Sequence, residues 1–160
     1  MEESKTFTLA EAHLYFAKTL NGKVWELLEK ENRTIADDEL MTHAAHASCL
    51  HWLEAGTVVN HQRGEWLIAH VYTVLGKTDA ALEHARRCFA LTEGHADQMQ
   101  DFDRAYAFES LARANALAGN HDEALTFFNL AEEAGQAIQE DGEKKYFLLD
   151  FSGGNWHGLI

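Results

Sequence analysis

The chain has 160 residues, and its 46% hydrophobic content is enough for one compact domain with its own core. Its formal net charge of −13, from 13 Lys and Arg against 26 Asp and Glu, argues against nucleic acid or an anionic membrane as the main partner. No apolar run approaches the roughly 20 residues of a membrane-spanning helix. Because the acidic N-terminus is not a secretory signal, we expect a cytoplasmic protein with reduced thiols.

Six helices are predicted between residues 8 and 139, because apolar residues recur with a helical period and proline is absent. Thr8 followed by Glu11, and Thr34 followed by Asp37, fit the capping boxes that begin helices. We expect the first helix to continue across Gly22, and several of the others to end near a glycine. The predicted spans are 8–30, 34–56, 61–75, 78–92, 102–118 and 121–139.

Residues 140–160 have a different pattern. The apolar patch YFLLDF is followed by the glycine-rich stretch SGGNWHGLI. Glycine disfavours a helix, yet Trp156 is costly to leave in water. We therefore expect an extended tail docked against the helices or against another subunit. Disorder is the alternative, since chain ends are loose unless they are tied down.

Two segments, VLGKTDAALEHARRCFALTE and LAGNHDEALTFFNLAEEAGQ, align with each other without gaps. Both contain a glycine, a short turn, an aspartate, and then small or apolar residues every three or four positions. This pattern describes a helix pair that closes on itself, with small residues that let the two helices approach closely. The aligned pairs include Gly76 with Gly119, Ala81 with Ala124, and Cys88 with Ala131.

These segments resemble the tetratricopeptide repeat, in which a glycine ends the first helix and small residues are spaced along the second. Two departures are the spacing of Gly76 and Gly119, 119 − 76 = 43 residues rather than roughly 34, and the missing proline. The chain also resembles a group of short, uncharacterised bacterial proteins with tetratricopeptide-like folds. The stretches that carry this second resemblance are HASCLHW, RGEWLIAHVYTVLG, HARRC, DFDRAYAFESLARANALAG and GGNWHG.

The resemblance implies an all-α fold in which antiparallel helix pairs form a tetratricopeptide-like right-handed array. We expect a single domain over residues 1–160. It would comprise an atypical N-terminal pair at 8–56, two repeat-like pairs at 60–139, and the docked tail at 140–160. The resemblance supplies no activity.

In stacked helix pairs the first helix of each pair lines the concave face. Arginine pairs bidentately with carboxylates and stacks on aromatic rings, so such a face favours binding of a protein or peptide, including an acidic one. The chain would then be a noncovalent scaffold or adaptor. The alternative is that the aromatic residues are core and the arginines are paired locally. The residues placed on this face are Arg63, Trp66, His70, Tyr106, Glu109 and Arg113.

The second functional hypothesis is a metal-binding protein or metal-dependent enzyme. On a helix, Glu39, His43 and His46 fall within about 60° of one another, at spacings i, i+4 and i+7. Zinc or another divalent metal accepts such a donor set, and His70 is a further candidate ligand. However, the spacing is not HExxH, and a chain with ten histidines forms such pairs readily. A packed helix–helix seam is the other interpretation.

An enzyme is less expected than a binding protein. The sequence contains no GxSxG, P-loop or GxGxxG pattern, and the two cysteines form no CxxC motif. We therefore assign no catalytic residue, and no cofactor apart from the hypothetical divalent metal. A homodimer is also compatible with the sequence, because the end pair of a helical array leaves an apolar face open.

Overall fold

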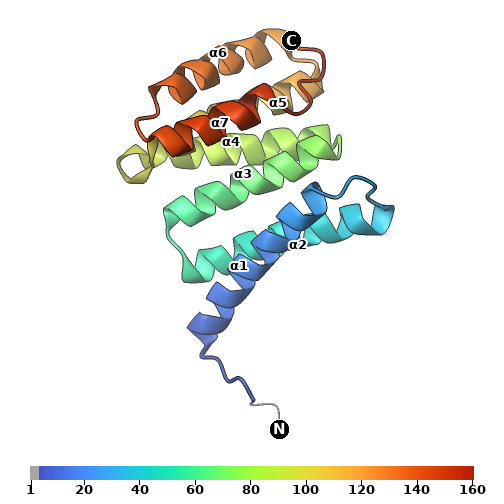
Figure 1. The fold of residues 1–160 in the computed structure, drawn as a ribbon, viewed down its shortest axis with the longest axis vertical. Coiled ribbons are helices and arrows are strands. Elements are labelled where there is room, and N and C mark those ends of the chain that lie inside the picture. Colours follow the sequence, from blue (N-terminus) through green and yellow to red (C-terminus); the bar gives the residue numbers. More distant parts are fainter. Residues whose placement is uncertain (1–3) are drawn as a thin grey trace.

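The computed structural model describes residues 4–160, and within this range the chain folds into seven α-helices and a short 3-10 turn (Figure 1). The described residues include no helix that is both long and apolar enough to cross a lipid bilayer. The elements are α1 (Leu9–Leu28), α2 (Ile35–Ala55), α3 (Val58–Val74), α4 (Thr78–Gly94), η1 (Ala96–Gln98), α5 (Asp101–Ala118), α6 (His121–Ala137) and α7 (Asp141–Ser152).

The first six helices match the predicted spans, and the largest difference at any end is 61 − 58 = 3 residues, at the start of α3. Both capping boxes are present. Thr8 Oγ1 accepts a hydrogen bond from the Glu11 backbone N–H at 3.2 Å, and the Glu11 carboxylate accepts from the Thr8 N–H at 2.8 Å. Thr34 and Asp37 repeat this arrangement at 3.2 and 2.8 Å. The caps satisfy backbone donors that the first turn leaves unpaired, which fixes where each helix begins.

The two aligned glycines form the same turn twice. Gly76 and Gly119 have φ angles of 69° and 77°, in the left-handed region that glycine enters without strain. Next to them, the Lys77 N–H donates to the carbonyl of Tyr72 at 2.9 Å, and the Asn120 N–H donates to that of Asn115 at 2.9 Å. The sequence repeat therefore corresponds to a repeated helix ending.

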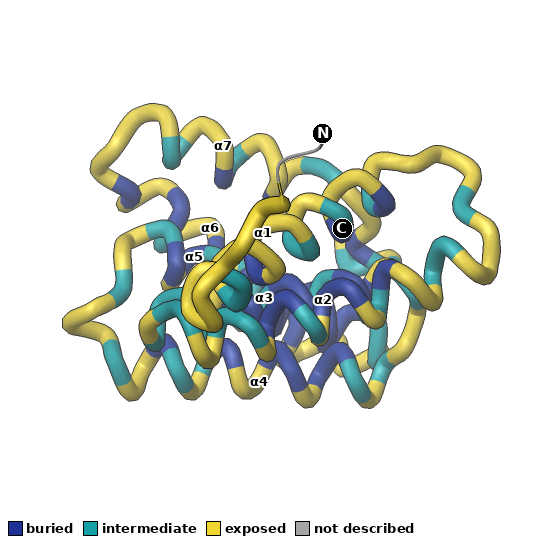
Figure 2. The backbone as a smooth tube through the Cα atoms, turned by 90° about the horizontal axis from the view of Figure 1, so that it is seen from below, coloured by how far each residue is buried: buried dark blue, intermediate teal, exposed yellow. Residues whose placement is uncertain are grey.

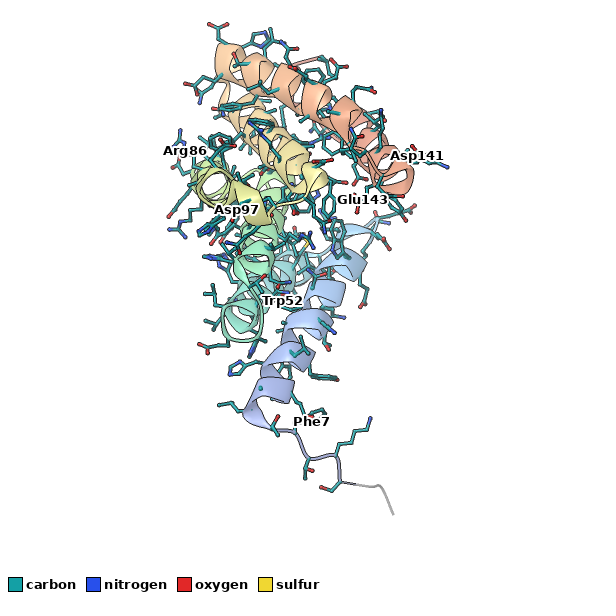
Figure 3. The ribbon with its side chains drawn as sticks, turned by 90° about the vertical axis from the view of Figure 1, so that its left-hand side faces the viewer. Phe7, Trp52, Arg86, Asp97, Asp141 and Glu143 are labelled. Atoms are coloured by element: carbon teal, nitrogen blue, oxygen red, sulfur yellow. The ribbon has the colours of Figure 1, made fainter. Side chains whose placement is uncertain are left out.

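Each odd-numbered helix from α1 to α5 packs against the helix that follows it, and α2 and α4 also pack on α3 and α5. Helices α3 and α5 contact each other directly, so they share one layer, with α4 behind them (Figures 1 and 2). In the side view of Figure 3, Arg86 of α4 lies on one side of the stack and Asp141 of α7 on the other. This packing of adjacent helix pairs is consistent with a helical repeat.

The core consists of three clusters in series along the stack. The first contains Val24, Met41 and Leu67, from α1, α2 and α3. The second lies between α3, α4 and α5, and the third combines α5, α6, α7 and the segment after it. The small residues expected at the close helix crossings are all fully buried, namely Ala81, Cys88, Ala124 and Ala131.

The expectation of an extended segment over residues 140–160 is wrong for residues 141–152, which form α7. The Glu140 carboxylate begins this helix by accepting hydrogen bonds from the N–H groups of Gly142 and Glu143, at 3.0 and 2.6 Å. Phe147 and Phe151, one turn apart, are buried against α5 and α6. The glycines that argued against a helix, in the stretch SGGNWHGLI, all lie beyond its last residue. After Ser152 the chain is not helical, and Trp156 is buried.

Candidate functional site

A groove lies between α1 and α7, with α3 and α5 as its floor, and Figure 1 shows α3 between the other two helices. It contains two adjoining cavities of about 530 and 410 Å³. Both volumes are within the range of sites that hold small molecules or single side chains. The cavities share Trp25, Trp66, Tyr106 and Asp150. We call this surface the concave groove.

All six residues predicted to bind a partner line the concave groove. Arg63 lies in the larger cavity, whereas His70, Glu109 and Arg113 lie in the smaller one. Trp66 and Tyr106 line both cavities. The first helices of the second and third pairs therefore do present these side chains together, although their contacts differ from those of a free recognition surface.

Trp66 is at the centre of the groove and contacts aromatic rings on three sides. Its ring stacks on that of His70 with centroids 5.0 Å apart, and packs edge-on against Tyr106 at 5.3 Å. Trp25 of α1 lies on a further side, at 6.1 Å. The indole N–H donates to a carboxylate oxygen of Glu109 at 3.2 Å. These contacts hold a large aromatic surface in a fixed orientation.

Arg63 is paired with a carboxylate of its own chain. Its guanidinium forms a bidentate pair with the Asp103 carboxylate, with N–O distances of 2.8 and 3.2 Å. It also lies 4.8 Å from the centroid of the Phe102 ring. Asp103 is buried, so this carboxylate depends on Arg63 for its charge balance. Little of the positive charge remains for a ligand.

Arg113 is a structural residue. It is buried, pairs with Glu109 one turn earlier, and lies with its guanidinium 3.9 Å from the centroid of the Trp156 ring. The same guanidinium donates hydrogen bonds to three backbone carbonyls of the C-terminal segment. The acceptors are the carbonyls of Asp150, Gly153 and Asn155, at 3.0, 2.9 and 3.2 Å.

The larger cavity is also lined by acidic residues that have no ion pair within residues 4–160. Glu29 and Asp150 line it, and neither has an ion pair within residues 4–160. Asp150 accepts a hydrogen bond from the Tyr106 hydroxyl at 2.6 Å, and burial together with this bond raises the pKa of Tyr106. The neutral hydroxyl therefore leaves the aspartate charge uncancelled. Gln62 also lines this cavity, and its Oε1 is the one buried side-chain polar atom of the described residues without a hydrogen-bond partner.

Sequence reasoning did not identify three residues that shape the groove, namely Trp25, Gln62 and Asp150. Trp25 does not lie on the apolar face of α1. Its position therefore indicated an aromatic side chain outside the core. Nothing in the sequence marks Gln62 or Asp150, because their positions depend on how α3 packs against α5 and α7.

The residues of the metal hypothesis lie on α2. Glu39, His43 and His46 are all exposed, and His46 forms a 2.8 Å hydrogen bond with the Tyr72 hydroxyl. His70 is in the concave groove, stacked on Trp66. Within residues 4–160, a different set of side chains has ligand atoms close enough together to bind one metal ion. This set consists of Cys49, His61 and Glu65.

Neither thiol is suited to nucleophilic chemistry. Burial and the nearby Glu65 raise the pKa of Cys49 to about 11, and burial raises that of Cys88 as well. A thiol acts as a nucleophile through its thiolate, which both environments disfavour at neutral pH.

No known protein family, curated protein or solved structure matches this chain.

Proposed function

We propose that this chain is a tetratricopeptide-like helical-repeat protein that binds a protein or peptide partner, noncovalently, through the concave groove. Three features support the proposal: the repeated glycine turns at Gly76 and Gly119, the direct contact of α3 with α5, and the aromatic surface around Trp66. In a right-handed array of this type, the first helices of successive pairs line the inner face.

The charges of the groove indicate which kind of partner it would bind. The guanidinium groups of Arg63 and Arg113 are both neutralised by carboxylates of the chain itself. Glu29 and Asp150, which form no ion pair within residues 4–160, line the larger cavity together with Trp25 and Trp66. The sequence allowed a protein or peptide partner, including an acidic one, whereas these contacts favour a segment that carries a lysine or arginine between apolar residues.

Aromatic faces and carboxylates together form a typical environment for a cation. An ammonium or guanidinium group over a tryptophan face gains about 0.5–2 kcal/mol, depending on how far it is desolvated. A basic side chain would thus satisfy the aromatic surface and the two carboxylates at once.

The test is a fluorescence-polarisation titration of the full chain with labelled short peptides. The peptides are identical except at one central position, which carries Arg, Lys, Ala or Glu between apolar residues. We expect the Arg and Lys peptides to bind at least about tenfold more tightly than the Glu peptide, equivalent to about 1.4 kcal/mol. The difference will shrink as salt is added, because salt screens exposed charges.

Two groove variants and one control make the test specific. Asp150→Asn keeps the hydrogen bond from Tyr106 but removes the charge, and Trp25→Ala removes an exposed ring face. Trp25→Ala is expected to weaken binding of the Arg peptide by about two- to thirtyfold, on the scale of a cation–π contact. Asp150→Asn is expected to weaken it by up to about fivefold, on the scale of an exposed ion pair. Asp97→Asn, an exposed acid outside the groove, will leave binding unchanged. Preferential binding of the Glu peptide would contradict the basic-partner proposal, and equal binding by wild type and Trp25→Ala would contradict the groove.

A further inference from the structure

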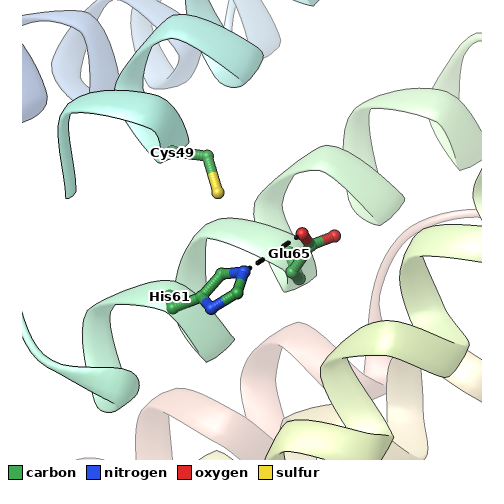
Figure 4. A group of neighbouring side chains, drawn as sticks. All are labelled: Cys49, His61 and Glu65. Carbon is green, nitrogen blue, oxygen red and sulfur yellow. Dashed lines mark ion pairs between the residues drawn. The ribbon is translucent and has the colours of Figure 1, made fainter. Parts of the chain in front are cut away.

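Three side chains of metal-binding type meet where α2 packs against α3 (Figure 4). Cys49 comes from α2, and His61 and Glu65 come from successive turns of α3. The Cys49 sulfur, an imidazole nitrogen of His61 and a carboxylate oxygen of Glu65 all lie within 4.8 Å of one another. None of the three lines either cavity of the concave groove, so the cluster is separate from the proposed peptide site.

The distances suit a tetrahedral metal. Two ligands that each lie about 2.0–2.1 Å from zinc are about 3.3 Å apart at the tetrahedral angle. His61 Nε2 and Glu65 Oε1 are 3.4 Å apart. A sulfur at about 2.3 Å from the same ion would lie about 3.6 Å from each of them. Since Cys49 Sγ is already within 4.8 Å, a side-chain adjustment of about 1 Å completes the arrangement.

The donor atoms identify the class of metal. A thiolate sulfur, an imidazole nitrogen and a carboxylate oxygen suit zinc and neighbouring divalent transition metals. Magnesium and calcium, in contrast, prefer sites built from oxygen ligands alone. Three protein ligands leave a fourth tetrahedral position for water.

Gly64 makes room for the sulfur. A Cβ atom at this position would lie 2.8 Å from Cys49 Sγ and 3.2 Å from Cys49 Cβ. Any other residue would force α3 away from α2 or displace the sulfur from the two α3 ligands. The position between His61 and Glu65 is therefore occupied by the one residue type that permits this approach.

A second contact orients the carboxylate. His84 of α4 has its Nδ1 2.6 Å from Glu65 Oε2, which leaves Oε1 directed toward His61. Carboxylate ligands of metals are commonly held by such outer hydrogen bonds, which fix their orientation. Glu65 and Cys49 are buried, whereas 32% of the His61 side chain is exposed, so an ion can enter beside His61.

We propose that Cys49, His61 and Glu65 bind one zinc ion or a similar divalent transition metal, with His84 as an outer residue that orients Glu65. On binding, the Cys49 thiol proton leaves to solvent and the sulfur takes the metal in its place. The ion would then link α2 directly to α3, and so join the first helix pair to the second.

Cobalt(II) is the decisive probe, because its bond to a thiolate gives a charge-transfer absorption in the near ultraviolet. The full chain, purified without an affinity tag, is titrated with cobalt, and the bound ion is then displaced with zinc. The chain has two cysteines, so Cys88→Ala is a matched control for Cys49→Ala. We expect the absorption at one ion per chain in wild type and in Cys88→Ala, and its loss in Cys49→Ala.

Zinc competition with a chromophoric chelator tests the other ligands. His61→Gln is expected to weaken zinc binding at least tenfold, and His84→Gln by about 10–100-fold, as for other outer-shell partners. Glu39→Gln and His43→Gln, on the exposed face of α2, will leave zinc binding unchanged. Because the His61 side chain is partly exposed, its variant remains informative if Cys49→Ala fails to fold.

A wild-type protein without the thiolate–cobalt absorption would overturn the proposal. The same conclusion would follow if the absorption persisted in Cys49→Ala, or if zinc bound equally to wild type and His61→Gln. Loss of zinc binding in Glu39→Gln or His43→Gln would instead place the metal on the exposed face of α2.

Discussion

The guanidinium of Arg113 lies 3.9 Å from the ring centroid of Trp156, and this contact joins α5 to the segment that follows α7. Hydrogen bonds from the same group to the carbonyls of Asp150, Gly153 and Asn155 strengthen the attachment. Arg113 thus acts on the chain's own backbone in the way that a peptide-binding protein acts on its ligand.

Replacing Arg113 with alanine will destabilise the protein more than the same change at Arg63. Removing Arg113 leaves Glu109 buried without its charge partner, for which we expect a loss of about 3–5 kcal/mol in the free energy of unfolding. Arg63→Ala also leaves a buried carboxylate, Asp103, without its ion pair. Arg113 in addition holds three backbone carbonyls and the Trp156 ring of the C-terminal segment, so its loss will be larger. Urea-induced unfolding of the two variants measures the difference, and equal losses would contradict this additional role of Arg113.

Gly135→Ala will weaken the attachment of α7. A Cβ atom at this position would lie 2.2 and 2.4 Å from two ring carbons of Phe147, which is fully buried. The ring must move, and overpacking of this kind costs about 1–3 kcal/mol. The gain in helix propensity, about 1 kcal/mol, offsets part of the cost. Thermal unfolding should therefore show a lower midpoint, and Phe147→Leu, which replaces the ring with a smaller side chain, should restore part of it in the double variant.

Gly22→Ala will have the opposite effect. Gly22 lies within α1, and a Cβ atom there would meet no heavy atom within 4 Å. Alanine loses less backbone entropy on folding, so we expect the free energy of unfolding to rise by about 0.5–1 kcal/mol. The same thermal experiment compares it with Gly135→Ala. A decrease on both substitutions would mean that α1 needs flexibility at this glycine.

Stability will fall as the pH drops through the histidine range. Burial beside Trp66 lowers the pKa of His70 from 6.5, with a smaller contribution from Arg113, although Glu109 and Asp150 act in the opposite direction. The unfolded chain then binds this proton more readily than the folded one. His70 therefore favours folding fully above about pH 6.5, and this contribution is lost as the pH falls toward the lower folded-state pKa.

Urea unfolding between about pH 8 and 5.5 checks this prediction, with the decline in stability as the readout. His70→Gln will decline less steeply than wild type. His121→Gln, at the exposed start of α6, serves as the control and should follow the wild-type curve. The pKa values of His46 and His157 are also lowered, mainly by burial, so part of the decline will remain in His70→Gln. Identical slopes for the two variants would refute the assignment to His70.

The helices from α1 to α6 were predictable because their signals are local. A Thr cap with an acid three residues on, or a glycine after the last turn, acts within a few residues of the chain. Helix α7 was missed because the glycine-rich stretch after Ser152 was given too much weight. Phe147 and Phe151 already have the spacing of a buried helical face, and Glu140 supplies the cap.

The grouping of these side chains in one groove was predictable, but the partners of the charged ones were not. The repeat pattern placed Arg63, Trp66 and Arg113 on one surface, where they are found. Whether an arginine is free depends on distant partners, such as Asp103 or the carbonyl of Gly153. The cluster of Cys49, His61 and Glu65 was equally inaccessible, since it depends on the register between two helices. Spacing within one helix can suggest ligands on that helix alone.

The close approach of Cys49 and Gly64 also constrains how the sequence can change. The two residues share one small volume between α2 and α3, so a gain of atoms on one side requires a loss on the other. Alanine at position 64 would fit best with glycine at position 49, because its Cβ would lie only 3.2 Å from the Cβ of a larger residue there. Across descendants of this sequence, position 64 should therefore stay glycine wherever position 49 is cysteine, and should gain side-chain atoms only together with a smaller residue at position 49.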